Sequence, residues 1–367
     1  MTWQILNFIL IIVIIKRKEE KMLKKAALLA GAVMVAVSTG FASDADLLKK
    51  AQSFFKPLPK EMPAPKDNPT TPEKVELGKK LYYDPRLSLS GVISCNTCHN
   101  LASYGVDNVE TALGHQFKTG GRNSPTVLNA GFHVAQFWDG RAKTLEDQAK
   151  GPILAHVEMA MPNPDYVVAK LKTIPGYVEE FKKVFGGDNP ITYDNVAKAI
   201  AAFERTLVTP SRFDKFLQGD TNALTKEEKE GLRLFIDKGC VGCHNGVAVG
   251  GTMFAKFGIF KQYPTYDLGK YKLTKKEEDK YVFKVPSLRN IDRTYPYFHD
   301  GAVWSLREAV EIMAETQLGK KLSTEEADKI VAFLKSLTGD IPVEARTMPV
   351  LPPSTDETPK PRLKIHD

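Results

Sequence analysis

Apolar residues recur at helical spacing in two clear stretches of the chain. The stripes are Val196, Ile200, Phe203 and Leu207 in the first, and Ile330, Phe333, Leu334 and Leu337 in the second. Thr192 precedes the first stripe as a candidate N-cap, and Ser323 with Glu326 forms a capping box before the second. Because residues three and four positions apart share one helix face, each stretch predicts an amphipathic helix that packs against a core.

A second pattern also occurs twice, each time shortly after a predicted helix start. Residues 78–82 read GKKLY and residues 231–235 read GLRLF. Thr71 is the candidate N-cap of the first helix, and Thr225 with Glu228 forms the capping box of the second. The repetition predicts a duplicated helical framework, in which each copy ends with one of the amphipathic helices.

All four cysteines fall in two copies of the pattern Cys-x-x-Cys-His, which is typical of covalent c-type haem attachment. Two thiols bind the haem vinyl groups, and the adjacent His reaches the iron as an axial ligand. The predicted attachment residues are Cys95, Cys98 and His99 for the first haem, and Cys240, Cys243 and His244 for the second. A disulfide framework or a redox dithiol would leave both histidines without a role. A Cys2His2 zinc site is disfavoured because each His directly follows its second Cys.

These patterns predict a mainly α protein with two cytochrome c-like helical domains, each around one covalent haem. We expect the first domain to span residues 43–210 and the second to span residues 211–340. Residues 341–367 are rich in proline and charge, so we expect a tail that lies over the surface or is disordered.

Residues 1–42 read as a leader. Lys24 and Lys25 precede an apolar run over residues 26–37, and a small-x-small cleavage site follows, as in a secretory signal peptide. Met22 is then the expected start, and the mature protein is expected in the periplasm. The earlier apolar run over residues 5–15 is short for a membrane span. It reflects either an over-early start codon, which we favour, or a weak anchor.

Composition indicates a soluble globular protein, with 43% hydrophobic and 26% charged residues. The formal net charge is +7, and much of it lies in the leader. The propionates of two haems would bring the remainder close to neutral. Because no basic stripe or reading motif accompanies this charge, a nucleic-acid partner is not expected.

The sixth iron ligand decides what each haem can do. Three methionines follow His244, and Met253 is too near along the chain to cross the haem, whereas Met348 lies in the tail. Met313 is therefore the predicted ligand of the second iron, and its thioether would raise the potential of that haem. The alternative is that Met313 simply packs in the core of a helical stripe.

The first haem has a different set of candidates. His115, His133 and His156 follow its attachment motif, and Glu158 directly precedes Met159, with Met161 two residues further on. A glutamate in an apolar setting can hold a raised pKa and transfer a proton, which cleavage of an O–O bond requires. Glu158 could equally be a surface carboxylate beside two packing methionines, and the residues alone leave both readings open.

Several runs together resemble the bacterial di-haem cytochrome c peroxidase family, over most of residues 44–340. They are the two haem motifs and residues 120–126 (GGRNSPT), 137–141 (FWDGR), 157–161 (VEMAM), 202–207 (AFERTL), 285–290 (VPSLRN) and 297–301 (YFHDG). The resemblance implies a peroxidatic first haem and an electron-transfer second haem. It also implies hydrogen peroxide as the substrate.

The resemblance also implies roles for matching residues. His115 is similar to a distal ligand that blocks the first iron until the second haem is reduced. Glu158 and Gln148 resemble the distal acid–base residue and its polar companion, and Trp138 resembles an aromatic between the haems. The remaining implied residues are Asn123, Thr294 and Pro296 around one Ca²⁺, the last two through backbone carbonyls, and Arg289 and His299 near the haem propionates. For His299 an interface role is an alternative, as is ordinary surface pairing for Arg289.

The implied electron donor is a small mono-haem cytochrome c or a cupredoxin, and the family typically forms homodimers. One rival hypothesis is an electron-transfer cytochrome without catalysis. Another is a di-haem oxidase that matures a tryptophan-derived cofactor in another protein. That group has Tyr at the position of Met313, which favours the peroxidase.

Overall fold

The computed structural model of the protein describes residues 43–363. The predicted leader over residues 1–42, its alternative start at Met22 and the last residues of the tail lie outside this range. Among the described residues, no helix combines the length and the apolar character that crossing a membrane requires.

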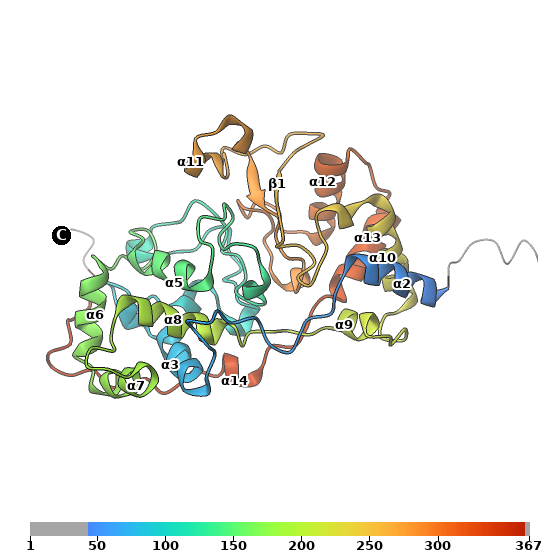
Figure 1. Cartoon of the computed structure of the whole chain (residues 1–367). Helices are drawn as coiled ribbons and strands as arrows, with labels where there is room; N and C mark the ends of the chain where they lie inside the picture. The colour runs from blue at the N-terminus through green and yellow to red at the C-terminus, as the bar shows by residue number, and fades with distance from the viewer. Residues whose placement is uncertain (1–42, 364–367) are drawn as a thin grey trace, which may run out of the picture. The chain divides into compact units, whose positions relative to one another are not determined.

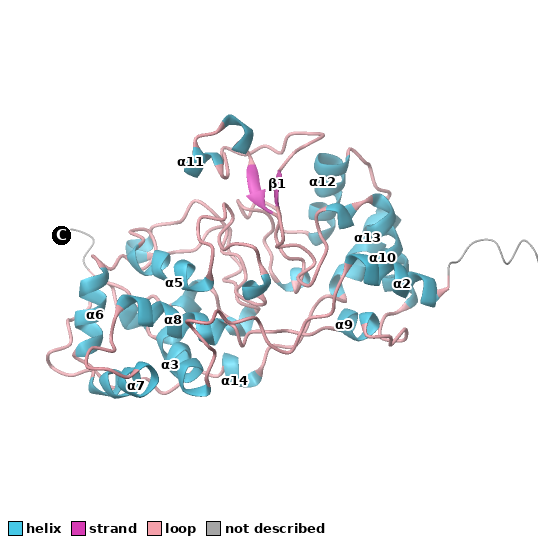
Figure 2. Ribbon diagram, in the orientation of Figure 1, coloured by secondary structure: helices cyan, strands magenta, loops and turns pink. Residues whose placement is uncertain are grey.

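Helices dominate the described part of the chain, which confirms the predicted mainly α fold (Figures 1 and 2). The α-helices are α2 (Asp44–Phe54), α3 (Pro72–Tyr83), α4 (Cys95–Cys98), α5 (Leu145–Leu154), α6 (Pro164–Lys172), α7 (Pro175–Phe185), α8 (Tyr193–Glu204), α9 (Arg212–Leu217), α10 (Lys226–Lys238), α11 (Tyr271–Thr274), α12 (Leu306–Leu318), α13 (Thr324–Lys335) and α14 (Val343–Arg346). The strands β1 (Phe254–Lys256) and β2 (Val282–Lys284) pair antiparallel, with Phe254 opposite Lys284.

In the first half of the chain, α3 and α8 pack closely against each other (Figure 1). A Cβ atom at Gly78 would lie 1.9 Å from the carbonyl oxygen of Ala199, so this contact requires glycine. The predicted stripe of α8 is buried, although Leu207 lies beyond the helix end at Glu204. Thr192 caps the helix as expected, because its side chain accepts a hydrogen bond from the amide of Asn195 at 3.1 Å.

The second half repeats this helix pair with α10 and α13. A Cβ atom at Gly231 would lie 1.8 Å from the carbonyl oxygen of Lys329. Both predicted capping boxes are present, at the start of α10 and at the start of α13. The stripe of α13 is buried as well, and its last member, Leu337, lies beyond the helix end at Lys335.

The duplication extends further than the sequence pattern indicated. At one constant residue offset, Pro125, Asn129, Trp138, Thr144 and Pro152 correspond to Pro286, Asn290, His299, Ser305 and Met313. The two asparagines have left-handed backbones, with φ of 60° and 61°, and each precedes a 3₁₀ turn. Thr144 and Ser305 cap α5 and α12. The same arrangement of loops and helices, which we call the frame, therefore occurs once in each half of the chain.

The two copies of the frame exchange backbone hydrogen bonds. The amide of Asn123 donates to the carbonyl of His299, and the amide of its counterpart Lys284 donates to the carbonyl of Trp138. Both bonds measure 2.8 Å. Residues from each half therefore meet in a pseudo-symmetric seam.

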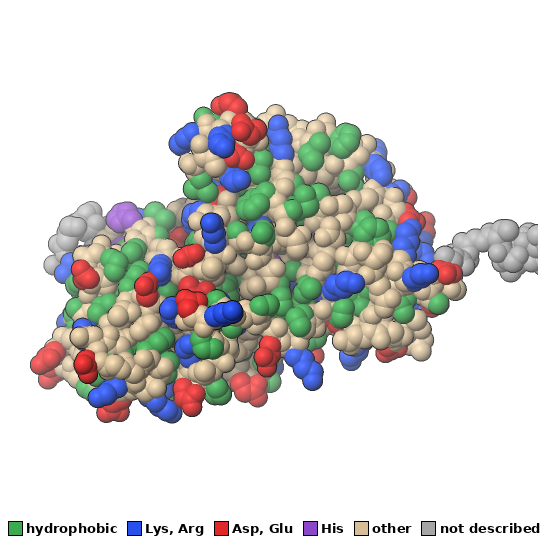
Figure 3. Space-filling model, in the orientation of Figure 1, with side chains coloured by type: hydrophobic (Ala, Val, Ile, Leu, Met, Phe, Trp, Pro, Cys, Tyr) green, Lys and Arg blue, Asp and Glu red, His purple; other side chains and the backbone are tan. Residues whose placement is uncertain are grey.

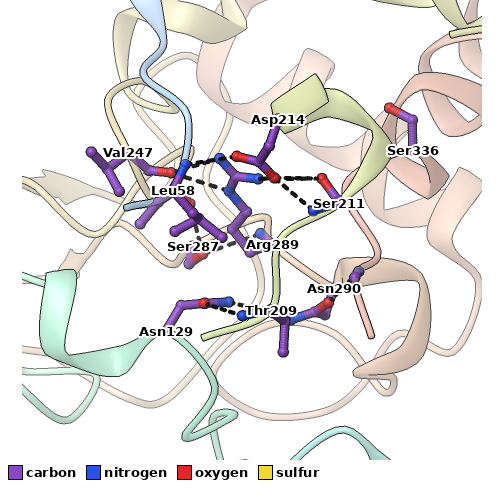
Figure 4. A network of polar contacts seen from close by, with 12 residues as sticks. Leu58, Asn129, Thr209, Ser211, Asp214, Val247, Ser287, Arg289, Asn290 and Ser336 are labelled. Atoms are coloured by element: carbon purple, nitrogen blue, oxygen red, sulfur yellow. Dashed lines mark hydrogen bonds and ion pairs between the residues drawn. The ribbon is translucent and has the colours of Figure 1, made fainter. Parts of the chain in front are cut away.

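A buried hydrogen-bond hub lies next to the predicted domain boundary at residue 210 (Figure 4). The side-chain amides of Asn129 and Asn290 both donate to the hydroxyl of Thr209, each at 2.8 Å. The amide of Thr209 donates in turn to the side-chain oxygen of Asn129 at 3.1 Å. One linker residue thus binds the equivalent asparagine of each half. The boundary itself stays a prediction.

Arg289 forms a buried ion pair in the same region (Figure 4). Its guanidinium lies 2.6 Å from a carboxylate oxygen of Asp214 and donates two further hydrogen bonds to the carbonyl of Val247. Asp214 also accepts hydrogen bonds from the backbone amides of Leu58 and Ser211, each at 2.7 Å. Burial alone would raise the pKa of Asp214, but the Arg289 charge and these hydrogen bonds hold it below its usual value.

The Asp214→Asn variant is expected to lose about 3 kcal/mol of unfolding free energy at pH 7, because it leaves a buried guanidinium without its counter-charge. The depressed pKa means that Asp214 stabilises the parent above the ordinary carboxyl pKa, and that this contribution fades as the pH falls further. The loss in the variant should therefore shrink in acid. Urea unfolding between pH 3 and pH 7 measures both effects, with exposed Asp188→Asn as the control. Equal stability of parent and variant at pH 7 would contradict this account.

The two ends of the described chain pack against opposite halves. Phe55, which we predicted within the first domain, packs its ring against Phe213 and Phe235 of the second half, at centroid distances of 5.3 and 6.4 Å. It also forms a backbone bridge with Gly246. The start of the predicted 43–210 domain therefore contributes to the core of the following one.

The proline-rich tail returns to the first half. Ala345 is buried in the first-half core, and its carbonyl accepts a hydrogen bond from the hydroxyl of Tyr83 at 2.9 Å. Further along, the hydroxyl of Thr355 donates to the carbonyl of Thr173 at 2.9 Å, and the amide of Arg362 donates to the carbonyl of Leu89 at 2.9 Å. Residues 341–363 are thus ordered along the first half.

Acidic and basic side chains are interspersed over the face of the molecule shown in Figure 3. Around α11, for example, Lys270 lies 3.7 Å from Asp279, and Lys280 lies 2.6 Å from Glu277. Such pairs balance much of the local charge on this face.

Candidate active site and haem sites

The second attachment motif opens into a large cavity. Cys240 lies in a 3₁₀ turn, Cys243 and His244 follow it, and all three residues line an open cavity with about 1760 Å³ of empty space, its mouth included. Met313 of α12 lines the same cavity, as we expected for the opposite ligand. The walls are mainly apolar and include Phe235, Val285, Leu288, Ile330 and Leu334. Two thiols, an imidazole and a thioether around an apolar space are a donor set that fits a covalent haem.

Burial lowers the pKa of His244 to about 4, and the carbonyls of Val249 and Pro286 face the ring and partly offset that shift. A neutral imidazole is the form that ligates a metal. The buried Nδ1 of His244 makes no hydrogen bond within the described residues. His99 of the first motif has the same surroundings, because burial lowers its pKa and the carbonyls of Gly105 and Pro125 oppose the shift. Pro125 and Pro286 are equivalent in the duplicated frame.

The first attachment motif forms the short helix α4, with His99 at its C-terminal end. The hydroxyl of Tyr82 donates to the carbonyl of His99 at 2.5 Å, which anchors the motif to α3. Burial raises the pKa of the Cys98 thiol to about 12, and the charges of Asp107 and Glu158 add to this rise. Glu158 therefore lies within electrostatic range of the first haem site.

Glu158 is half-buried, and the two methionines that follow it, Met159 and Met161, are buried in the core. Burial raises the pKa of the Glu158 carboxyl, and the Arg141 guanidinium opposes part of that rise. Arg141 itself stacks over the ring of Phe137 at 3.5 Å from the ring centroid. These surroundings favour the acid–base reading of Glu158 over a surface carboxylate. Arg141 is part of the 137–141 motif, but the sequence alone indicated no role for it.

His115 lies at the tip of a tight loop whose ends, Leu113 and Thr119, form a backbone bridge. The side chain of His115 is buried, and its Nδ1 has no hydrogen-bond partner within residues 43–363. The backbone amide of His115 donates to the carbonyl of Glu158 at 2.8 Å. A Cβ atom at Gly114 would lie 1.9 Å from the carbonyl oxygen of Val157. The loop therefore rests directly on the segment that carries Glu158.

Exposed apolar residues flank His115 in this loop. Phe117 is 78% exposed and Leu113 is 55% exposed, while His115 between them is 4% exposed. Burial lowers the pKa of His115, and the nearby Lys118 and His156 lower it further. The loop thus holds the imidazole of His115 inward, while the side chains of Leu113 and Phe117 are exposed.

Gln148 is half-buried on α5, where its backbone amide donates a hydrogen bond to the backbone carbonyl of Thr144 at 3.1 Å. Trp138 lies at the seam between the halves, because its indole Nε1 donates to the carbonyl of Asn123 at 2.9 Å and its ring meets His299 edge-on at 6.3 Å. Trp138 also lines the second haem cavity. This position fits an aromatic between two haems.

The three residues expected to hold calcium, Asn123, Thr294 and Pro296, line one cavity. The side-chain nitrogen of Asn123 donates to the carbonyls of Val109 and Glu110 at 3.0 and 3.3 Å, so its amide oxygen is the atom available as a ligand. Within residues 43–363, no three His, Cys, Asp or Glu side chains converge as a metal site. A calcium ion here would therefore depend on an amide, backbone carbonyls and water.

The two residues expected near the propionates have other contacts. Each guanidinium nitrogen of Arg289 donates a hydrogen bond to an oxygen of Asp214, Ser211 or Val247. His299 is buried, its Nε2 lies 2.9 Å from the hydroxyl of Thr265, and its ring stacks on Phe283 at 4.3 Å. His299 still lines the second cavity.

The duplicated frame gives a reason for the difference between the haems. Met313 in α12 corresponds to Pro152 in α5, so the first half offers no thioether at that position. Sequence reasoning found Met313 by elimination and did not detect this equivalence.

Two cytochrome c-like helical units, each with one haem-attachment motif, define a di-haem c-type cytochrome. A family model described as di-haem cytochrome c peroxidase matches residues 72–222, and a cytochrome c model matches residues 228–338. The chain is 48% identical over 339 residues to cytochrome c551 peroxidase of Pseudomonas aeruginosa, covering 90% of this chain and 97% of that protein. The chain belongs to the di-haem cytochrome c peroxidase family, and its cofactors are two haem c groups.

Two other relatives support this assignment. Cytochrome c551 peroxidase of Nitrosomonas europaea is 52% identical over 295 residues, which cover 80% of this chain and 87% of that protein. Among solved structures, a MauG-like protein associated with microbial copper homeostasis superposes with a TM-score of 0.72 at 29% identity. That match covers 80% of this chain and 98% of the other.

Proposed function

We propose that this protein is a periplasmic cytochrome c peroxidase, which reduces hydrogen peroxide to two molecules of water with two electrons and two protons. The observation that carries the proposal is the position of Glu158. Its carboxyl has a raised pKa and lies within electrostatic range of the first attachment motif. Its backbone carbonyl accepts a hydrogen bond from the amide of His115 at 2.8 Å. An acid placed beside a haem iron that can open is the arrangement that peroxide reduction needs.

The chemistry supplied by the bound haems is electron transfer and coordination of peroxide at the first iron. With the haem in place, Glu158 would take a proton from one oxygen of the peroxide and deliver it to the oxygen that leaves as water. The raised pKa of Glu158 brings it closer to neutral pH, where a group can both accept and donate a proton. Gln148, on the neighbouring helix α5, is proposed to hold the peroxide or its product water.

His115 is proposed as the ligand that closes the first iron in the fully oxidised protein. One electron at the second haem, ligated by His244 and Met313, would release the loop and open the first site. The loop suits this role because His115 is buried while its neighbours Leu113 and Phe117 are exposed. Trp138, at the seam, is proposed as the stepping stone for electrons between the haems.

Several further features belong to this proposal. One Ca²⁺ bound by Asn123, Thr294 and Pro296 would order the seam beside Trp138. The leader over residues 1–42 supports export to the periplasm. The donor is proposed to be a small mono-haem cytochrome c or a cupredoxin, and the working unit a homodimer.

The test is the EPR spectrum of the calcium-loaded holoprotein, fully oxidised and after one electron per two haems. Half-reduction should produce a high-spin first haem that reacts with peroxide, and chelation of calcium should suppress this change. If both haems stay low-spin and inert in both states, the protein is an electron carrier and the peroxidase proposal fails.

The His115→Gly variant is expected to react with peroxide without prior reduction, because the iron ligand is absent. The measurement is the rate of spectral change when peroxide is added to the fully oxidised variant. His156→Gly is the matched control, since His156 is exposed and lies 2.6 Å from Lys118 of the same loop. A variant that remains low-spin and unreactive when oxidised would exclude His115 as the gate.

A further inference from the structure

Lys284 is a buried lysine without a counter-charge. It ends strand β2, it is 7% exposed, and it lines the cavity that contains Cys240, Cys243 and Met313. Burial is the sole influence on its pKa, which falls to about 8, and no carboxylate of the described residues offsets that fall. Lysine is rarely buried unless it is paired, because removing an ammonium from water costs free energy that only an anion or strong acceptors return.

A second polar residue, His133, lies beside the same cavity. His133 lines it, and the buried Nε2 of His133 has no hydrogen-bond partner among the described residues. The charge of Lys284 lowers the pKa of His133 in addition to the effect of burial, so the two side chains lie within electrostatic range. The ring packs on Gly251, where a Cβ atom would lie 2.5 Å from its Cδ2. The Nε2 of His133 is therefore held against Gly251 and is not open to the cavity, which leaves Lys284 as the partner for an anion there.

The cavity already defines the class of ligand. Thiols at Cys240 and Cys243 fix a haem by its vinyl edge, and the propionates are the anionic groups of that molecule. The structure assigns the propionates of the second haem to Lys284, which supplies an ammonium on the cavity wall. Arg289, which the sequence indicated for this role, has its nitrogens bonded to protein oxygens instead.

The position of Lys284 also fixes where the propionates of the second haem lie. The amide of Lys284 donates to the carbonyl of Trp138 at 2.8 Å, so the propionates are held at the seam between the two halves. The Lys284 charge offsets the propionate charge there. Because the oxidised haem carries one more positive charge than the reduced haem, removing the ammonium should favour oxidation and lower the potential.

The experiment is a spectroelectrochemical titration of the second haem in the holoprotein, comparing the parent with Lys284→Met. We expect the ratio of oxidised to reduced second haem at a fixed potential to rise on the order of tenfold. For one electron this equals a fall of about 59 mV in midpoint potential. Lys256→Met is the matched control, since Lys256 is an exposed lysine of the paired strand β1. Lys284→Arg, which retains the charge, should keep the parent potential.

The inference rests on attachment of the second haem at Cys240 and Cys243, and the titration needs no peroxide turnover. A protein inactive with peroxide could still show the shift, so the two proposals fail separately. An unchanged potential in Lys284→Met, or an equal shift in Lys256→Met, would overturn the assignment. If Lys284→Met does not retain two haems per chain, a Lys284→Arg variant that does so with the parent potential supports it. Loss of the haem from both variants would indicate a packing role and overturn it.

Discussion

The Glu158→Gln variant is expected to lose peroxide turnover by about 10²- to 10⁴-fold while both haems remain attached, because it loses the proton-transferring group and little else. Glutamine keeps the size of the side chain and its capacity to form hydrogen bonds. The backbone carbonyl of Glu158, which accepts from His115, is unchanged by the substitution. Release of the His115 loop on half-reduction should therefore persist, so the defect should appear in reaction with peroxide. Stopped-flow measurement of the half-reduced protein with peroxide separates these steps.

Glu179→Gln is the control, because Glu179 is an exposed glutamate on α7, away from both haem motifs. It should retain parental turnover and haem content. Parental turnover in Glu158→Gln would show that the proton moves through another group. A Glu158→Gln protein that no longer opens its first iron would assign Glu158 to the gate.

The Met313→His variant is expected to lower the midpoint potential of the second haem by on the order of 0.1 V, within the ~0.8 V range that axial ligands set. Thioether ligation favours reduced iron, and an imidazole in its place favours oxidised iron. The donor should then fail to half-reduce the protein, since each 59 mV changes the redox ratio about tenfold. Steady-state turnover with a reduced cytochrome should fall by at least that factor.

The matched control is Met348→His, the same change at a methionine that is 65% exposed in the tail. It should leave the potential unchanged. If Met313→His titrates like the parent, Met313 is a core residue and the second iron has another ligand. A strong chemical reductant should restore peroxide reactivity to the variant, because the first haem site is intact.

Helix starts and packing faces could be predicted from the sequence because local chemistry decides them. The capping boxes at Thr225 and Ser323 and the cap at Thr192 are present. The apolar stripes are buried, and only their last members, Leu207 and Leu337, lie beyond the helix ends. In both cases the periodic pattern continues into a buried turn, and periodicity alone does not reveal where the helix ends.

The haem attachment motifs were visible because covalent chemistry requires fixed spacing. The surroundings of the haems were less accessible, because long-range packing decides them. Arg289 has the charge expected of a propionate partner, and it pairs with Asp214, which is far away in the sequence. Its propionate role stays a prediction. In the sequence, Lys284 cannot be distinguished from an ordinary strand lysine. The fold buries it in the wall of the second haem cavity. Neither outcome has a local signal in the sequence.

Each end of the described chain packs against the half that is farther from it in the sequence, and this has a consequence for how the protein is assembled. A chain that is synthesised from its N-terminus presents the first half before the tail. Yet Ala345 belongs to the first-half core and Phe55 packs into the second half, so neither half can be completed early. The nascent protein must stay open until its last residues arrive. That delay leaves both Cys-x-x-Cys-His motifs accessible to the haem-attachment machinery. The two halves then complete their packing together, when the segments near both chain ends are in place.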